Sequence, residues 1–130
     1  MKLNLDYYKE TENNKLTEKE EQIISKFFER EEIRDLENIL DDNSSLEEIE
    51  VISDHRKNII SFYPINSEET ILQIGANFGE ITGELCKKAK KVVAVESKKA
   101  KAETIAKRYS NIENLEIIAG ELKDLKLEEK

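Results

Sequence analysis

The sequence is poor in the residues that form disulfides and metal sites. It has one cysteine, Cys86, and one histidine, His55, among 130 residues. A lone cysteine cannot form an internal disulfide, which is typical of proteins from a reducing cytoplasm. We therefore predict a cytoplasmic protein without a metal, in which Cys86 is a small buried hydrophobe and His55 a solvent-facing helix residue.

Long apolar runs are also absent. No stretch approaches the roughly 20 apolar residues needed to span a bilayer, and the polar sequence that follows Met1 lacks the hydrophobic core of a secretory signal. We therefore expect no membrane partner. Charged and hydrophobic residues each make up 38% of the chain, which is typical of a helix-rich globular protein. The length suits one modest domain, or half a domain with an appendage.

The net negative charge is confined to the first half of the chain. Residues 1–66 contain 17 Asp and Glu against 9 Lys and Arg, whereas residues 67–130 contain 12 of each class. The acidic half should be repelled by nucleic acid, which argues against nucleic acid as a partner. The lysines between residues 87 and 101 invite the opposite interpretation. Their interleaving with alanines, without nearby aromatic residues, favours solvated helix faces.

The first half is predicted to be helical after a polar leader at residues 1–15. Thr17 and Glu20 have the spacing of a capping box. Apolar residues follow at helical spacing, and the stripe at Phe27 and Phe28 is expected to be core: Ile23, Ile24, Phe27 and Phe28. A turn is expected at residues 41–44 and a further helix from Ser53 that ends at Pro64. We therefore assign residues 1–66 to an acidic helical N-terminal segment.

The second half alternates short apolar runs with charged helical stretches. Strands are predicted at residues 70–74, 92–95 and 115–119, with helices at 80–88 and 98–109 between them. Near-continuous apolar runs separated by helices are typical of parallel strands that are buried on both faces. Residues 67–130 are therefore predicted to form an α/β, Rossmann-like βαβαβ half-sheet of three parallel strands, with right-handed crossovers.

Glycines and acids follow the predicted strands at their carboxyl ends. Gly75 and Gly79 lie in the turn after the first strand, where a missing side chain lets the backbone approach a ligand. Glu96 lies 21 residues after Gly75, about the spacing at which a carboxylate binds a ribose diol. Gly120 and Glu121 close the third strand at the same edge of the sheet, although an acid there can also cap a helix.

These residues resemble a known family. The runs Ile71–Gly79, Val92–Glu96 and Ile117–Glu121 resemble the first three motifs of class I S-adenosylmethionine-dependent methyltransferases, in particular bacterial ones associated with glycosyltransferases. The run Ser53–Pro64 is similar to the helix that precedes their first strand. The resemblance extends from about Ser53 to Leu125.

The resemblance implies S-adenosylmethionine as the cofactor. Gly75 and Gly79 would line its methionine end, Glu96 would bind the ribose hydroxyls, and Glu121 would lie near the adenine. Asn77, in place of the family's middle glycine, is also assigned to the cofactor site; its side chain is expected to take up space near the ligand, while asparagine tolerates a left-handed backbone. Gln73 stands where the family usually has Asp or Glu, and capping of the strand end is its alternative role.

The family pattern continues beyond the motifs found here. Its further strands carry most contacts to the methyl acceptor, so we expect a cofactor-binding fragment of a truncated domain, inactive alone, with no assignable catalytic residue and an unknown acceptor. The family strand order 3-2-1 leaves the strand at residues 70–74 with an open edge. We expect self-association there, or a partner that supplies a strand.

Two other functions stay open. One is a non-catalytic Rossmann-like assembly module with a degenerate cofactor site, which Gln73 and Asn77 favour. The other is a nicotinamide-dinucleotide enzyme, because an acid after the second strand also suits that cofactor. The turn lacks the G-x-G-x-x-G pattern suited to a pyrophosphate, so this interpretation ranks last.

Overall fold

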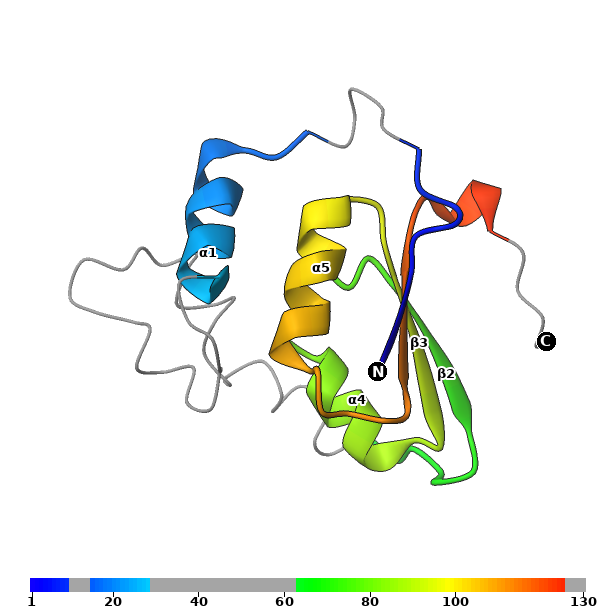
Figure 1. The fold of residues 1–130 in the computed structure, drawn as a ribbon. Helices are drawn as coiled ribbons and strands as arrows, with labels where there is room; N and C mark the ends of the chain where they lie inside the picture. Colours follow the sequence, from blue (N-terminus) through cyan, green and yellow to red (C-terminus); the bar gives the residue numbers. More distant parts are fainter. Residues whose placement is uncertain (10–14, 29–62, 126–130) are drawn as a thin grey trace.

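The computed structural model describes residues 1–9, 15–28 and 63–125 of the chain (Figure 1). The predicted turn at residues 41–44, the predicted helix from Ser53 and His55 lie outside the described residues. The elements follow in this order: β1 (Lys2–Asn4), α1 (Glu18–Phe28), β2 (Thr70–Ile74), α4 (Thr82–Lys88), β3 (Lys91–Glu96), α5 (Lys99–Arg108), β4 (Leu115–Ala119) and the 3-10 helix η4 (Leu122–Asp124).

The strands form one parallel sheet in the order β1-β4-β3-β2. The three strands predicted from the sequence are confirmed, as is their relative order. Val92 lies between Ile71 of β2 and Leu115 of β4, which sets the register of the sheet. Parallel strands need crossover connections, and α4 and α5 supply them between β2, β3 and β4.

The N-terminal strand corrects the prediction that residues 1–15 are a polar leader outside the fold. Leu3 of β1 is the register partner of Ile117 of β4, and it packs against the hydrophobic core. The sheet therefore has four described strands and not three. The element was missed because only one apolar side chain marks it, and its pairing partner lies more than 100 residues further along the chain.

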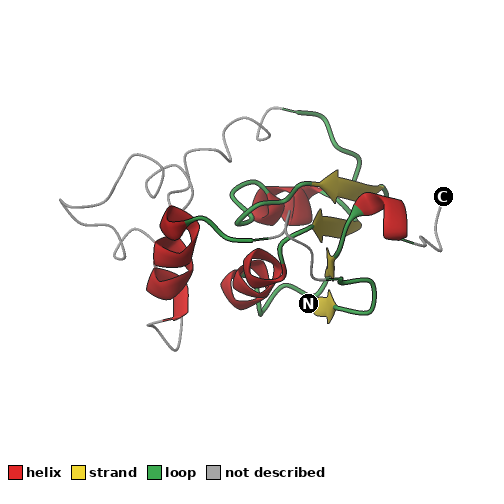
Figure 2. Ribbon diagram, turned by 90° about the horizontal axis from the view of Figure 1, so that it is seen from above, coloured by secondary structure: helices red, strands yellow, loops and turns green. Residues whose placement is uncertain are grey.

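The described α-helices lie in layers on one side of the sheet. α4 and α5 pack on the strands and α1 packs on the outer side of α5 (Figure 1), and the view from above shows the same separation (Figure 2). The core fills the space between the sheet and the inner helices. Its buried members are Ala76, Leu85, Cys86, Ala89, Val92, Ala94, Ala102, Ile105, Ala106, Leu115, Ile117 and Ala119.

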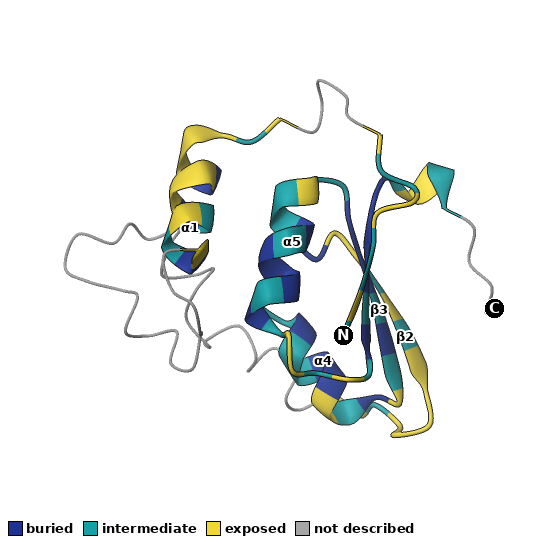
Figure 3. Cartoon of the chain, in the orientation of Figure 1, coloured by how far each residue is buried: buried dark blue, intermediate teal, exposed yellow. Residues whose placement is uncertain are grey.

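Burial is uneven across the sheet (Figure 3). Ile71 and Gln73 of β2 face the helices, because Ile71 packs against the core and Gln73 contacts α4. Side chains alternate along a strand, so Leu72 and Ile74 point to the opposite face, where both are exposed. The prediction that all strands are buried on both faces is therefore wrong for β2.

Helix α1 begins with the predicted capping box. The Thr17 backbone N–H donates to Glu20 Oε1 at 3.1 Å, and the Glu20 N–H donates to Thr17 Oγ1 at 3.2 Å. Ile23 and Phe27 are fully buried, as their helical spacing predicted, whereas Phe28 is exposed, so the prediction that Phe28 belongs to the core is wrong. No helix in the described ranges is long and apolar enough to cross a membrane. The boundary placed at residue 66 stays a prediction.

Candidate cofactor site

The turn between β2 and α4 has an unusual backbone. Gly75, Asn77 and Gly79 adopt φ values of 70°, 56° and 78°, which lie in the left-handed region. Glycine enters this region without steric strain, and asparagine tolerates it better than most residues. The N–H groups of Gly75 and Ala76 both donate to the Val95 carbonyl, at 2.9 and 3.1 Å. The turn is thereby fixed against the carboxyl end of β3.

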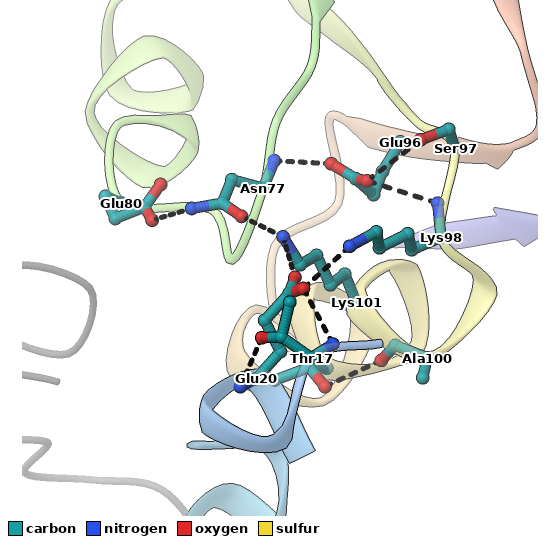
Figure 4. Close-up of polar contacts among 10 residues, drawn as sticks. Thr17, Glu20, Asn77, Glu80, Glu96, Ser97, Lys98, Ala100 and Lys101 are labelled. Atoms are coloured by element: carbon teal, nitrogen blue, oxygen red, sulfur yellow. Dashed lines mark hydrogen bonds and ion pairs between the residues drawn. The ribbon is translucent and has the colours of Figure 1, made fainter. Parts of the chain in front are cut away.

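Glu96 closes β3 directly beside this turn. Its side chain is buried; Oε2 accepts a 2.7 Å hydrogen bond from the Asn77 N–H, and Oε1 accepts one of 3.1 Å from the Lys98 N–H (Figure 4). The structure thus brings Glu96 and the glycine turn together, as their spacing predicted. Hydrogen bonds from backbone N–H groups to a carboxylate are charge-assisted and fix its position.

The side chain of Asn77 is directed away from Glu96 (Figure 4). Its Nδ2 donates to Glu80 Oε1 at 2.6 Å, and its Oδ1 accepts from Lys101 Nζ at 2.5 Å. The sequence led us to expect this side chain in the space near the ligand. The structure shows it held between the turn's own Glu80 and a lysine of α5, and its place relative to a ligand stays a prediction.

The two ends of the turn differ in the space around them. A Cβ added at Gly79 would lie 2.9 Å from Tyr109 Cε2, and the Tyr109 hydroxyl donates to the Gly79 carbonyl at 2.5 Å. Arg108 Nη1 also donates to the Phe78 carbonyl at 3.1 Å. At Gly75, by contrast, an added Cβ would meet no atom of the described residues within 4 Å. The Gly79 end is packed against α5, whereas the Gly75 end opens to space that a ligand can enter.

Glu121 lies at the same edge of the sheet. The Gly120 N–H donates to the Glu96 carbonyl at 2.9 Å, which brings the ends of β3 and β4 together. Glu121 is half-buried, forms an ion pair with Lys123 at 3.4 Å, and makes no side-chain capping hydrogen bond to η4. The capping role considered from the sequence is therefore not what the described structure shows.

Gln73 serves the packing of β2 on α4. Its Oε1 accepts a 2.7 Å hydrogen bond from the hydroxyl of Thr82, which is fully buried. Cys86, on the same helix, is buried as predicted, and burial raises the pKa of its thiol to about 11. A thiol with so high a pKa stays protonated near neutral pH, so Cys86 is a packing residue and not a nucleophile.

Two lysines predicted to be solvated belong to this region. Lys98 and Lys101 are largely buried, and both form ion pairs with Glu20 of α1 (Figure 4). The prediction of solvated helix faces is therefore wrong for these two residues. The only signal at Glu20 was its capping-box spacing, which gives no indication of partners on α5.

Similarity to known sequences covers part of the chain. The chain matches no protein-family model. It is 42% identical over 57 residues to a probable ribosomal RNA small subunit methyltransferase A of Methanosarcina acetivorans, which covers 44% of this chain and 21% of the relative. It is 37% identical over 79 residues to the protein of the same name from Thermococcus sibiricus, with coverage of 61% and 29%. The chain thus spans less than a third of these relatives.

Two solved structures share the fold. A dimethyladenosine transferase from Plasmodium falciparum superposes with a TM-score of 0.50 and 29% identity, over 57% of this chain and 27% of that protein. A phosphoethanolamine N-methyltransferase from Haemonchus contortus gives a TM-score of 0.56 at 20% identity, over 88% of this chain and 24% of that protein. The narrower resemblance to glycosyltransferase-associated enzymes stays a prediction. The chain thus has the class I S-adenosylmethionine-dependent methyltransferase fold, and the curated sequences it resembles are ribosomal RNA small subunit methyltransferases A.

Proposed function

We propose that this chain binds S-adenosylmethionine at the turn between β2 and α4, as the cofactor-binding part of a methyltransferase. The observation that carries the proposal is the buried Glu96 carboxylate, which the Asn77 N–H holds beside a turn that is open at Gly75. Open α/β sheets bind their ligands at this carboxyl edge.

Three features of the described residues support this cofactor. The Gly75 end of the turn leaves room for the methionine portion. Each Glu96 oxygen has two lone-pair sites, so the ribose hydroxyls can be bound while the bonds to the backbone persist. Glu121 lies at the adjoining strand end, where the resemblance to the family assigns the adenine.

The cofactor supplies an activated methyl group, and the chain's own residues supply position. A bound and oriented cofactor turns an encounter with the acceptor into a step with a large entropic advantage. We assign no acid, base or nucleophile to the described residues. Methyl transfer by the whole protein remains part of the proposal, because the chain spans only part of its relatives.

We further propose ribosomal RNA as the acceptor. The support comes from the relatives, which match about half of this chain and share the name ribosomal RNA small subunit methyltransferase A. The acidic balance of residues 1–66 argued against nucleic acid. That segment, however, repels RNA only from its own surface, and an RNA can still contact the neutral half of the chain.

A second candidate function is an assembly module that keeps the fold without using the cofactor. The exposed apolar side chains Leu72 and Ile74 on the edge strand β2 favour it. The two functions differ in one measurable property, which is the affinity for the cofactor product.

The test is calorimetric titration with S-adenosylhomocysteine, with NAD as the competing nucleotide. We expect saturable binding of S-adenosylhomocysteine alone. Glu96→Ala should weaken it by tenfold or more, because a charge-assisted contact is lost. Glu113→Ala, which removes an exposed carboxylate elsewhere, is the matched control and should leave affinity unchanged. Absence of heat at millimolar ligand from a folded protein would favour the assembly module.

A further inference from the structure

Helix α1 reaches the cofactor turn through a buried carboxylate. Only 5% of Glu20 is exposed. Its Oε1 accepts hydrogen bonds from the Thr17 N–H at 3.1 Å and from Lys98 Nζ at 2.6 Å, while Oε2 forms an ion pair with Lys101. Glu20 therefore has two roles: it completes the capping box of α1, and its carboxylate binds the two lysines at the start of α5.

Lys101 extends this contact to the turn (Figure 4). Its Nζ donates to Asn77 Oδ1 at 2.5 Å and lies 4.9 Å from the centre of the Phe78 ring. Glu80 accepts from the other end of the same amide. An ammonium on the amide oxygen and a carboxylate on the amide nitrogen fix which way the Asn77 side chain points.

We propose that Glu20 is a positioning residue of the cofactor turn. By holding Lys101 against Asn77, it keeps the asparagine side chain off the side of the turn that faces Glu96. The proposal rests on the proposed cofactor site. It explains how the chain accommodates an asparagine where the resembling family has glycine, since that side chain would otherwise be free to rotate toward the ligand.

The role belongs to Glu20 because Lys101 cannot hold this position on its own. Lys98 and Lys101 are both largely buried, and Glu20 is the carboxylate that separates their two positive charges. Removing one partner of a buried ion pair leaves an uncompensated charge that moves toward water. The flexible four-carbon stem of Lys101 would allow that movement. Asn77 Oδ1 would then lose the Lys101 ammonium that donates to it.

Glu20 is charged at neutral pH, where we expect the cofactor site to bind its ligand. Burial alone would raise its pKa, but hydrogen bonds from Lys101, Lys98 and the Thr17 backbone, with the Lys101 charge, lower the pKa from 4.5 to about 2. The charged groups around this contact are Lys98, Lys101, Glu80 of the turn and Glu96 at the end of β3. The ion pairs are therefore present throughout the neutral range.

The experiment is a double-mutant cycle read by affinity for S-adenosylhomocysteine. Glu20→Gln removes the charge but keeps a side chain that serves in a capping box, so α1 retains its start. We expect Glu20→Gln to weaken binding about tenfold in the natural chain. In an Asn77→Gly background, which has no side chain to misplace, the same change should alter affinity less than twofold. Glu21→Gln, the exposed neighbour on α1, is the control and should have no effect.

A second readout needs no ligand. The Asn77 side-chain amide signals in an NMR spectrum, identified by their loss in Asn77→Gly, should shift in Glu20→Gln and stay in place in Glu21→Gln. Equal loss of affinity in both backgrounds, or unmoved amide signals in Glu20→Gln, would overturn the proposal. If the natural chain binds no S-adenosylhomocysteine, the proposed function fails, and the amide signals alone still decide whether Glu20 positions Asn77.

Discussion

Strands β2 and β4 have similar apolar sequences and opposite environments. Each has five residues, of which most are apolar. In β4, Ile117 and Ile118 are 0% and 4% exposed, whereas in β2 Leu72 and Ile74 are 41% and 57% exposed. β4 lies between β1 and β3, while β2 has only β3 beside it among the described strands. Position in the sheet, and not hydrophobicity, determines which apolar side chains are buried.

The same contrast explains how each strand is held. β4 gains from two ladders of backbone hydrogen bonds and from the packing of α5. β2 has one ladder, with Ile71 and Gln73 directed at the helices. Apolar burial contributes about 25 cal/mol per Å², so β2 contributes little through its outer face.

Truncation of a central side chain should have the largest effect. Ile117→Ala is expected to lower the free energy of unfolding by about 2–4 kcal/mol, because it leaves a cavity in a packed core. Ile74→Ala, the matched change on β2, should lower it by less than about 1 kcal/mol, because that side chain is already largely in water. Urea unfolding of both variants measures the difference. Equal losses would mean that the outer face of β2 is covered in solution.

The turn that follows β2 should show the contrast at single glycines. Gly79→Ala places a methyl group 2.9 Å from the Tyr109 ring. The ring cannot easily move away, because its hydroxyl donates a hydrogen bond to the Gly79 carbonyl. We expect a loss of about 2–3 kcal/mol in the free energy of unfolding, from the clash and the left-handed backbone. Gly75→Ala suffers only the backbone strain, about 1 kcal/mol. Thermal unfolding monitored by circular dichroism should rank the two variants in this order.

Loss of the hydrogen bond between β2 and α4 should have the next largest effect on the free energy of unfolding. Thr82→Val removes the hydroxyl that donates to Gln73 and keeps the shape of the side chain. The free energy of unfolding should fall by about 1 kcal/mol. Thr70→Val, at the exposed start of the same strand, is the control and should change it by less than about 0.5 kcal/mol. If Thr70→Val lowered the free energy of unfolding as much as Thr82→Val, the hydrogen bond from Thr82 to Gln73 would not be the cause of the effect.

The smallest effect on stability is expected at the outer face of β2. Leu72→Lys should change the free energy of unfolding by less than about 0.5 kcal/mol. Lysines on an exposed edge strand do, however, oppose pairing with another chain. Light scattering across a tenfold dilution should detect self-association of the natural chain and its loss in the variant. A natural chain that stays monomeric throughout would refute the predicted pairing at this edge.

Much of the sheet could be predicted because its strands carry a local signal. The runs at residues 70–74 and 115–119 were predicted with the bounds that the structure shows, since each is apolar and ends at a turn or glycine. The exposure of Leu72 could not be predicted, because an apolar run does not reveal which face is covered. β1 was missed because it depends on pairing with β4 and not on its own composition.

The site was predictable to a similar degree. Gly75, Gly79 and Glu96 lie together because strand ends in a parallel sheet meet at one edge, and this follows from spacing alone. The contact between Glu20 and Lys98 joins residues 78 positions apart. It depends on how α1 packs on α5, which no periodicity in the sequence determines.

The pairing of β1 with β4 also bears on the order in which the molecule forms. Lys2 lies opposite Glu116, so β1 pairs with a strand that lies more than 100 residues further along the chain. Until residues 115–119 have been synthesised, β1 lacks the one neighbour that it has among the described strands, and closing so long a loop is slow in comparison with forming the local crossovers. We therefore expect β1 to dock after the crossovers that join β2, β3 and β4, and its backbone to stay available to other binders, such as chaperones, until β4 has been synthesised.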